Sequence, residues 1–262
     1  VDGDVTLDSA SDIDNTAGVI QAERALSVTS QGLTNVRGTL AGASVALDTR
    51  LGGVDNSEGI IAATAGTLDL RSGALENRAG LLQSSGGMSI DTHGQRLGNT
   101  DAGARGGIVS GAGLTLRAGE LDNRAGLVQA QTALDARLAS LDNRSGGQVG
   151  SGSSLLLQAQ HLDNSGGRLQ AAQNLTLALS GELVNQAGLA VAGGDLVAHA
   201  ARIDNRATSG GTALGLQGRN VDLTAAQIDN SSGMIAADQR IALPLGDAAA
   251  LYHCQRLRAE PG

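Results

Sequence analysis

Short alternations of aliphatic and polar residues run along almost the whole chain, and none extends over more than a few positions. Examples are Leu26-Ser27-Val28, Leu68-Asp69-Leu70 and Leu175-Thr176-Leu177. A period of two is expected of a strand that turns alternate side chains inward. The apolar spacing of a helix, at i, i+3, i+4 and i+7, is not sustained over ten positions, so the pattern predicts short strands throughout.

A second pattern sets the spacing of these strands, because an aliphatic residue, any residue and an asparagine recur in that order. The eleven asparagines are Asn15, Asn35, Asn56, Asn77, Asn99, Asn123, Asn143, Asn164, Asn185, Asn205 and Asn230. Their mean spacing is about 21.5 residues, and single steps run from 20 to 25. About three residues after each asparagine a glycine usually appears, followed by a branched residue and then, two places on, by a small one. Such a period is the signature of a repeat architecture.

Three short strands per repeat predict a solenoid. One coil of three strands cannot bury its inward face or pair its backbone, whereas stacked coils bond to their neighbours in parallel register. We therefore predict an all-β fold, a parallel β-helix of about eleven to twelve coils of roughly 21 residues, over residues 1–245. At ~4.8 Å per coil the rod would be roughly 50 to 60 Å long.

The recurring asparagines need a structural reason, since a buried amide costs free energy unless its hydrogen bonds are made. Stacked at the strand spacing, identical Asn side chains can bond to one another along the axis and to the backbone of the turn. Asn also accepts the left-handed backbone conformation of a sharp corner. We therefore predict a structural Asn ladder and no catalytic role for these residues.

Two repeats are longer than the others, with 24 residues from Asn99 to Asn123 and 25 from Asn205 to Asn230. Insertions in solenoids bulge at turns, so residues 101–107 and 208–212 are expected to form irregular loops. The repeat ends near Pro244. Residues 246–262 form either an irregular tail or a short capping helix from Asp247 through Arg258, and the sequence leaves both alternatives open.

Composition and charge limit the kind of core that the chain can form and the classes of partner that it can bind. The chain contains no Phe or Trp and one Tyr, so thin layers of aliphatic residues must replace a bulky core. The net charge is −8 and the 18 Lys and Arg residues are scattered, which argues against nucleic acid as a partner. A single cysteine, Cys254, allows no internal disulfide. Since Val1 begins in mid-pattern, the chain is expected to be a piece of something longer.

The aliphatic-Asp-Asn phrase, its glycine and the branched and small residues after it resemble the haemagglutinin repeat of filamentous haemagglutinin-type exoproteins. The resemblance covers about residues 4 to 243. It implies a right-handed parallel β-helix and export across the outer membrane by a two-partner-secretion transporter, through a domain that is not in this chain. It also implies the stalk of an adhesin or of a contact-dependent growth inhibition effector, placed at the bacterial cell surface.

Parallel β-helices also include enzymes that cleave acidic polysaccharides, which need paired carboxylates or a metal in a cleft. An Asp column supplies carboxylates at Asp14, Asp55, Asp122, Asp142, Asp163, Asp204 and Asp229. Because the aspartates recur beside the asparagines and are spaced by Arg124, Arg144 and Arg206, the pattern favours a structural position. The histidines show no ligand spacing. We therefore expect no catalytic, cofactor or metal site.

These observations favour a structural and adhesive function: the shaft of a large secreted bacterial surface exoprotein that projects a binding or effector tip. The expected partner is a receptor on a host cell or on a neighbouring bacterium. The alternative is that the segment binds a receptor itself, through a non-repetitive patch around residues 101–107 or 208–220. A β-helix polysaccharide-cleaving enzyme is the least favoured alternative.

Overall fold

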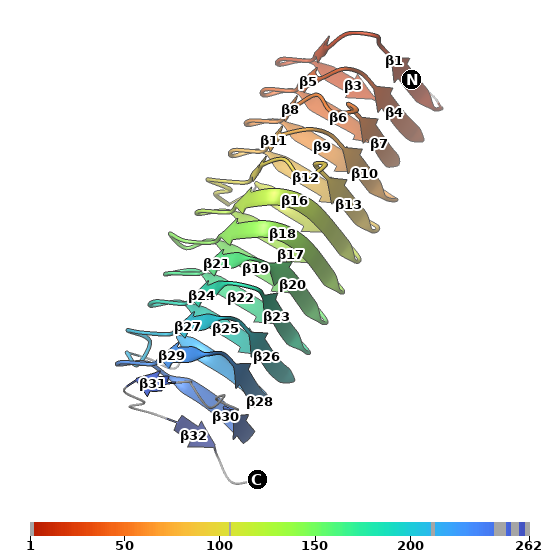
Figure 1. Cartoon of the computed structure of the whole chain (residues 1–262). Coiled ribbons are helices and arrows are strands. Elements are labelled where there is room, and N and C mark those ends of the chain that lie inside the picture. The colour runs from red at the N-terminus through yellow and green to blue at the C-terminus, as the bar shows by residue number, and fades with distance from the viewer. Residues whose placement is uncertain (1–2, 105, 211–212, 244–249, 253–256, 260–262) are drawn as a thin grey trace.

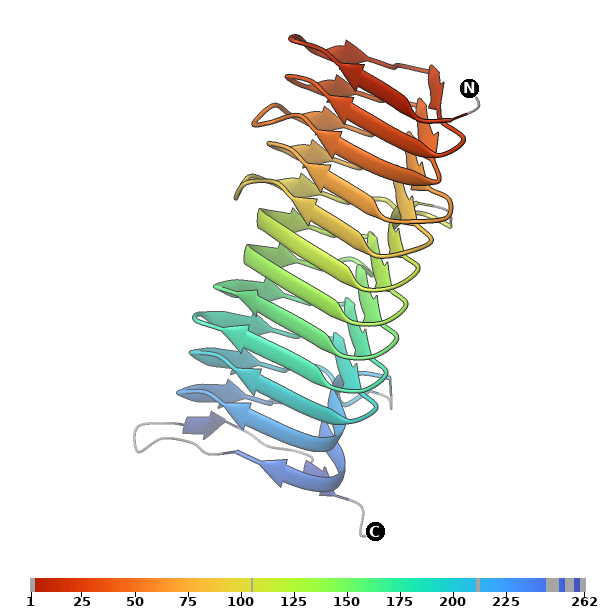
Figure 2. The same ribbon diagram turned by 90° about the vertical axis from the view of Figure 1, so that its right-hand side faces the viewer.

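The chain forms a straight rod of stacked coils, with the amino terminus at one end and the carboxyl terminus at the other (Figures 1 and 2). The computed structural model describes residues 3–104, 106–210, 213–243, 250–252 and 257–259. Within these residues every element is a strand, and strands pair in parallel with the equivalent strands of the coils before and after. The predicted parallel β-solenoid of about eleven coils is confirmed.

Each coil contributes a strand to three faces of the rod. Face 1, which leads into the asparagine, contains β2 (Ile13–Asp14), β5 (Leu33–Thr34), β8 (Val54–Asp55), β11 (Leu75–Glu76), β14 (Leu97–Gly98), the ends of β16 (Leu114–Asp122) and β18 (Leu134–Asp142), β21 (His161–Asp163), β24 (Glu182–Val184), β27 (Arg202–Asp204), β29 (Gln227–Asp229) and β31 (Ala250–Tyr252).

Face 2 follows the asparagine turn. It contains β3 (Val19–Gln21), β6 (Thr39–Gly42), β9 (Ile60–Ala63), β12 (Leu81–Ser84), β15 (Gly107–Ser110), β17 (Leu127–Ala130), β19 (Gln148–Ser151), β22 (Arg168–Ala171), β25 (Leu189–Ala192), the first parts of β28 (Gly215–Thr224) and β30 (Ile235–Ala242), and β32 (Leu257–Ala259).

Face 3 closes the coil. It contains β1 (Val5–Asp8), β4 (Ala25–Thr29), β7 (Ser44–Asp48), β10 (Leu68–Arg71), β13 (Met88–Asp91), the first parts of β16 and β18, β20 (Leu155–Ala159), β23 (Leu175–Leu179), β26 (Asp195–His199) and the ends of β28 and β30.

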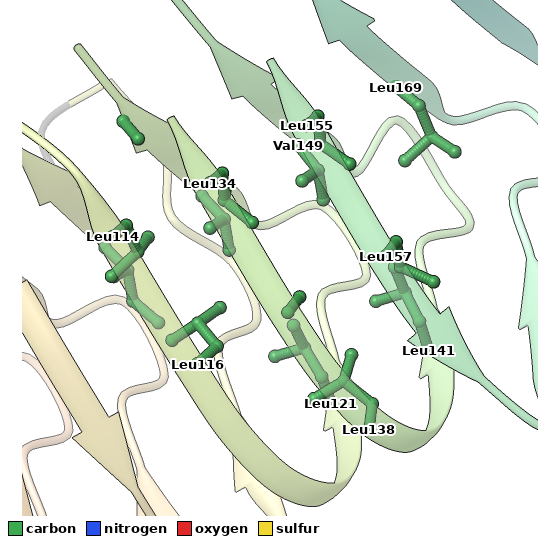
Figure 3. Packing of buried hydrophobic residues seen from close by; sticks show 14 of the residues in the cluster. Leu114, Leu116, Leu121, Leu134, Leu138, Leu141, Val149, Leu155, Leu157 and Leu169 are labelled. Carbon is green, nitrogen blue, oxygen red and sulfur yellow. The ribbon is translucent and has the colours of Figure 1, made fainter. Parts of the chain in front are cut away.

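The core is a set of aliphatic columns that run along the rod axis. The inward residue of face 2 is Leu82 in one coil and Ile108 in the next, and both are fully buried. Figure 3 shows the same arrangement in the middle of the rod, where leucines of successive coils such as Leu114, Leu134 and Leu155 stack above one another. Since the interior is only one residue deep from each face, branched aliphatic side chains fill it without aromatic rings.

A four-residue turn joins face 1 to face 2 and places the asparagine at its first position. In the regular coils the N–H of the glycine three residues later donates to the Asn carbonyl, as Gly38 does to Asn35 O at 3.0 Å. We expected the asparagine to adopt the left-handed conformation, and this expectation is wrong. The residue two positions after the asparagine adopts it instead. In all eleven turns this residue has a φ between 49° and 64°. Its N–H then bonds to the next coil, as Ala79 N does to Thr100 O at 2.9 Å.

The glycine of this turn is required by close approach between coils. A Cβ on Gly188 would lie 2.6 Å from Asn185 Oδ1 and closer still to the carbonyl oxygen of Asn164 in the preceding coil. Two coils lack this glycine and have Ala102 and Thr208 instead. These are the two coils with long repeats. The chain there makes a loop before strands β15 and β28 begin, so the expected irregularities at residues 101–107 and 208–212 are placed at this turn; residues 105 and 211–212 lie outside the described part.

The carboxyl-terminal region continues the coil pattern in two places. Strand β31 pairs with β29, and β32 pairs with β30, both in parallel. A helix from Asp247 through Arg258 is therefore wrong for residues 250–252 and 257–259, and so is an irregular tail. These short strands give backbone partners to β29 and to the first part of β30, which would otherwise form an open sheet edge. The other residues of the range 246–262 lie outside the described part.

Replacing Gly188 with Ala should lower the free energy of unfolding by about 1–3 kcal/mol, because the new Cβ forces Asn164 and Asn185 apart. Urea denaturation followed by circular dichroism measures this change. Gly87→Ala is the control, since the nearest atom to its built Cβ is 3.6 Å away. Equal denaturation midpoints for the two variants would contradict the close-approach explanation.

Candidate functional site: the asparagine ladder and its charged edge

The eleven asparagines form one continuous ladder inside the rod. In each coil the Nδ2 group donates to the Oδ1 of the next asparagine, beginning with Asn15 to Asn35 and ending with Asn205 to Asn230. The ten bonds measure 2.6 to 2.8 Å. Asn15 is 7% exposed and the other ten are at most 1% exposed. Each bond is therefore shielded from water along the whole length of the ladder.

The second N–H of the amide serves the backbone of the turn. Asn143 Nδ2 lies 3.0 Å from Gly147 O in its own turn and 3.3 Å from Arg168 O in the next coil. Asn123 and Asn164 make the same inter-coil bond, to Gln148 O and Leu189 O. The amide thus donates along the axis and towards the turn, while its oxygen accepts from the coil before. This full use of donors and acceptors explains how a polar side chain is tolerated at a buried position.

The Asp column lies at the same turn, one residue before seven of the eleven asparagines. Asp14, Asp55 and Asp163 each accept the backbone N–H two residues ahead, at 2.8 to 2.9 Å. This is the local bond that Asp makes when it opens a turn. These bonds give the aspartates a structural part in the turn, and each aspartate of the column has a bonded partner in its own coil.

Arginines tie part of the Asp column together along the axis. Arg124 and Arg144 each fold back onto the aspartate two residues before them, with bonds of 2.7 to 2.9 Å. Each also reaches the aspartate of the next coil at 3.6 Å, from Arg124 to Asp142 and from Arg144 to Asp163. Arginines thus separate the aspartates of successive coils, so that opposite charges are in contact. We call this stretch, from Asp122 to Asp163, the Asp–Arg edge.

Asp122 is the most strongly held carboxylate of this edge. Two hydrogen bonds from Arg124 and one of 2.7 Å from Arg96 reach a side chain that is only 3% exposed. The guanidinium of Arg124, helped by Arg96, lowers the pKa of Asp122 to about 2 against the opposing effect of burial. The same pairing with Arg206 lowers the pKa of Asp204, although burial opposes it. These carboxylates stay ionised and act as fixed anions.

A second polar column was missed in the sequence. Ser30, Thr49, Ser72 and Thr92 are fully buried at the corner between face 3 and face 1, and each hydroxyl donates to a turn carbonyl at 2.6 to 3.0 Å. From Ala118 onward the equivalent residues are apolar. The near-regular spacing of these four hydroxyl residues could have indicated a second column in the sequence. The corners between face 3 and face 1 differ in length, however, so the sequence alone does not align the four residues.

The described part of the chain holds no cluster of three or more His, Cys, Asp or Glu side chains arranged to hold a metal ion. His93 Nδ1 lies 2.9 Å from Ser72 O, and His161 lines a shallow groove with Ser140 and Glu182. His253 and Cys254 lie outside the described residues. Nor do the described residues form a helix long and apolar enough to cross a membrane.

Comparison with known families finds the haemagglutinin repeat at residues 1–57, 43–97, 89–140, 133–187 and 180–243. The chain belongs to the haemagglutinin repeat family. The resemblance to filamentous haemagglutinin-type exoproteins is thereby confirmed, and one family match spans two to three coils of the rod. No curated protein and no solved structure matches the chain. The haemagglutinin repeat and the solenoid together point to a structural protein of the adhesin type.

Replacing Asn143 with Leu should lower the free energy of unfolding by about 1–3 kcal/mol for each group left unpaired. Asn123 Nδ2 loses its acceptor and Asn164 Oδ1 loses its donor. The midpoint of urea denaturation measures the effect. Asn15→Leu is the matched control, because Asn15 begins the ladder and its replacement breaks one of the ten bonds instead of two. An unchanged midpoint for Asn143→Leu would disprove the ladder as a source of stability.

Replacing Asp122 with Asn should remove a pH-dependent part of stability. Since the folded pKa of about 2 lies below the unfolded value near 3.8, the carboxylate stabilises the fold above about pH 4, and this is lost as the pH falls towards 2. The difference in unfolding free energy between wild type and variant should be about 2 kcal/mol larger at pH 7 than near pH 2. Denaturation at several pH values tests this.

Asp163→Asn is the control for this titration, because the nearest arginine nitrogen lies 3.6 Å from Asp163. At pH 7 it should lower the free energy of unfolding less than Asp122→Asn does, because it breaks no close arginine pair. If Asp122→Asn destabilised the rod equally at pH 7 and near pH 2, the Asp–Arg edge would not be the cause.

Proposed function

We propose that the chain is a shaft and adhesion segment of a large secreted bacterial surface exoprotein, and that it projects a binding or effector tip to host or neighbouring cells. The observation that carries this proposal is the unbroken Asn ladder, which extends through eleven coils. Each coil adds the same rise and the same axial bonds, so length is gained in fixed increments and bending must strain many short bonds at once.

Membership of the haemagglutinin repeat family supports the secreted, surface-exposed setting. The proposed partners are a receptor on a host cell or neighbouring bacterium, and an outer-membrane two-partner-secretion transporter that engages another domain. The turn aspartates are engaged in their own coils, which gives no support to a polysaccharide-cleaving role.

The two loops favour a second candidate, in which the segment binds a receptor itself. Both loops leave the rod between face 1 and face 2, after Asn99 and after Asn205 (Figure 1). They therefore lie on one edge, five coils or about 24 Å apart at the strand spacing. A receptor that bridges both loops would explain why the irregular repeats share this turn.

A deletion in phase with the coils tests the shaft. Removing residues 143–184 joins Asp142 to Asn185 and takes out two whole coils. The shortened chain should fold with the same circular dichroism spectrum, and its maximum dimension in small-angle X-ray scattering should fall by about 10 Å. Removing residues 143–174 instead joins Asp142 to Leu175, breaks the phase of the ladder and should prevent regular stacking. Equal behaviour of the two deletions would contradict the modular shaft.

Cell binding separates the two candidates. The fluorescently labelled chain is applied to epithelial cells and to other bacteria, beside an unrelated β-solenoid of equal length. A passive shaft should bind no better than this control. Saturable binding that disappears when residues 101–107 or 208–220 are replaced would favour the receptor-binding candidate instead.

A further inference from the structure

Face 2 differs from the other faces in its outer surface. In each coil the first and third positions of this strand segment point away from the core columns, and they form two columns along the rod; Leu189 in the first column is only 5% exposed. The first column is Val19, Thr39, Ile60, Leu81, Gly107, Leu127, Gln148, Arg168, Leu189, Gly215 and Met234; the second is Gln21, Ala41, Ala62, Gln83, Val109, Gln129, Gly150, Gln170, Val191, Gln217 and Ala236. Arg168 is the one charged residue in these two columns.

Apart from Arg168, the charged residues of the described chain lie outside these two columns. Face 1 carries the Asp–Arg edge, and the outer side of face 3 carries residues such as Asp69, Arg71 and Asp135. Val19 is 70% exposed and Ile60 is 39% exposed, and they are two of the three large hydrophobic residues exposed in the described part. An extended outer surface with one charge is unusual on a chain with a net charge of −8.

The size of this face approaches that of a stable interface. Eleven coils at ~4.8 Å give a length of about 50 Å, and a strand segment of four residues gives a width of about 13 Å. The product is about 650 Å² on one copy, against about 800 Å² per partner in a standard interface. Small residues in the second column, Ala41, Ala62 and Ala236 among them, leave room for side chains that approach from outside.

We propose that face 2 docks against face 2 of a second copy of this chain, with the two rods antiparallel. Every copy carries the same net negative charge, so two rods repel each other at their acidic edges but not across these columns, whose one charged residue is the positive Arg168. Both surfaces repeat at the same coil spacing, so side chains of one can interleave with those of the other coil by coil, as in other dry packings of β-sheets.

Two-fold symmetry sets which residues meet. If the rods overlap along their full length, the coil of Asn123 lies at the axis and the coil of Asn56 faces that of Asn185. Ala62 then lies opposite Val191 of the second copy. Arg168, whose guanidinium donates to Gln170 Oε1 at 2.7 and 2.9 Å, faces the coil of Leu81 and Gln83 and keeps an amide partner. This pairing of two rods is independent of the proposed function, because it involves only face 2 and not the tip that the shaft would project.

Sedimentation equilibrium of the full chain tests this proposal. The wild-type mass should rise with concentration from 26.1 kDa towards twice that value. The double variant Ala62→Glu/Val191→Glu places like charges opposite each other and should raise the dissociation constant about tenfold or more. Ala62→Lys/Val191→Glu places opposite charges there and should restore pairing. All these positions face outward, so circular dichroism should show the same fold.

The control Ser27→Glu/Thr176→Glu adds the same two charges on face 3 and should pair almost like wild type. A wild-type mass of 26.1 kDa at every concentration would overturn the proposal. An equal loss of pairing in the face 2 and face 3 glutamate variants would overturn the choice of face. Failure of the Lys/Glu variant to recover would overturn the antiparallel docking.

Discussion

The hydrogen bond between equivalent backbone groups of successive coils is the constraint on which the structure depends. Since these bonds run along the axis, any residue placed at a corner must leave room for the coil above and below and must point its own polar groups along the same line. The turn after each asparagine meets this demand with a left-handed residue whose N–H reaches the next coil, and with a glycine where two carbonyls come close. The Asn ladder extends the same principle to side chains.

Repetition also explains why the polar residues of this rod are structural. A side chain at a fixed place in the coil has its own equivalent about 4.8 Å away on either side, so it either bonds to that neighbour or must be separated from it. Asparagine, which donates and accepts, bonds to its equivalents directly. Aspartate cannot, and it turns to the backbone N–H of its own turn and to arginines such as Arg124. The paired charges of the Asp–Arg edge therefore lie on face 1, although the backbone of all three faces pairs in the same parallel way.

The departures from regularity follow the same logic. Coils that lack the turn glycine, at Ala102 and Thr208, carry the inserted loops, because a Cβ at this position cannot follow the regular path. Thr208 adapts by donating its hydroxyl to Asn205 O and by accepting the N–H of Met234. At the corner between face 3 and face 1, buried hydroxyls give way to apolar residues from Ala118 onward, and the two coils that follow the change have continuous strands, β16 and β18.

The sequence by itself determined the period, the three strands of each coil, the aliphatic columns and the stacked asparagines, because each of these is a local pattern repeated at a constant interval. It also indicated that the Asp column is structural. Only the tertiary structure decided that the left-handed residue lies two positions after the asparagine, since Ala, Arg, Glu and Ser there carry no signal of that conformation. The buried hydroxyl corner, the reach of Arg124 and Arg144 to the aspartates of the next coil, the terminal strands β31 and β32 and the sparsely charged face 2 were also decided there. Each depends on which residues some twenty positions apart lie side by side, and the irregular repeats shift that register from coil to coil.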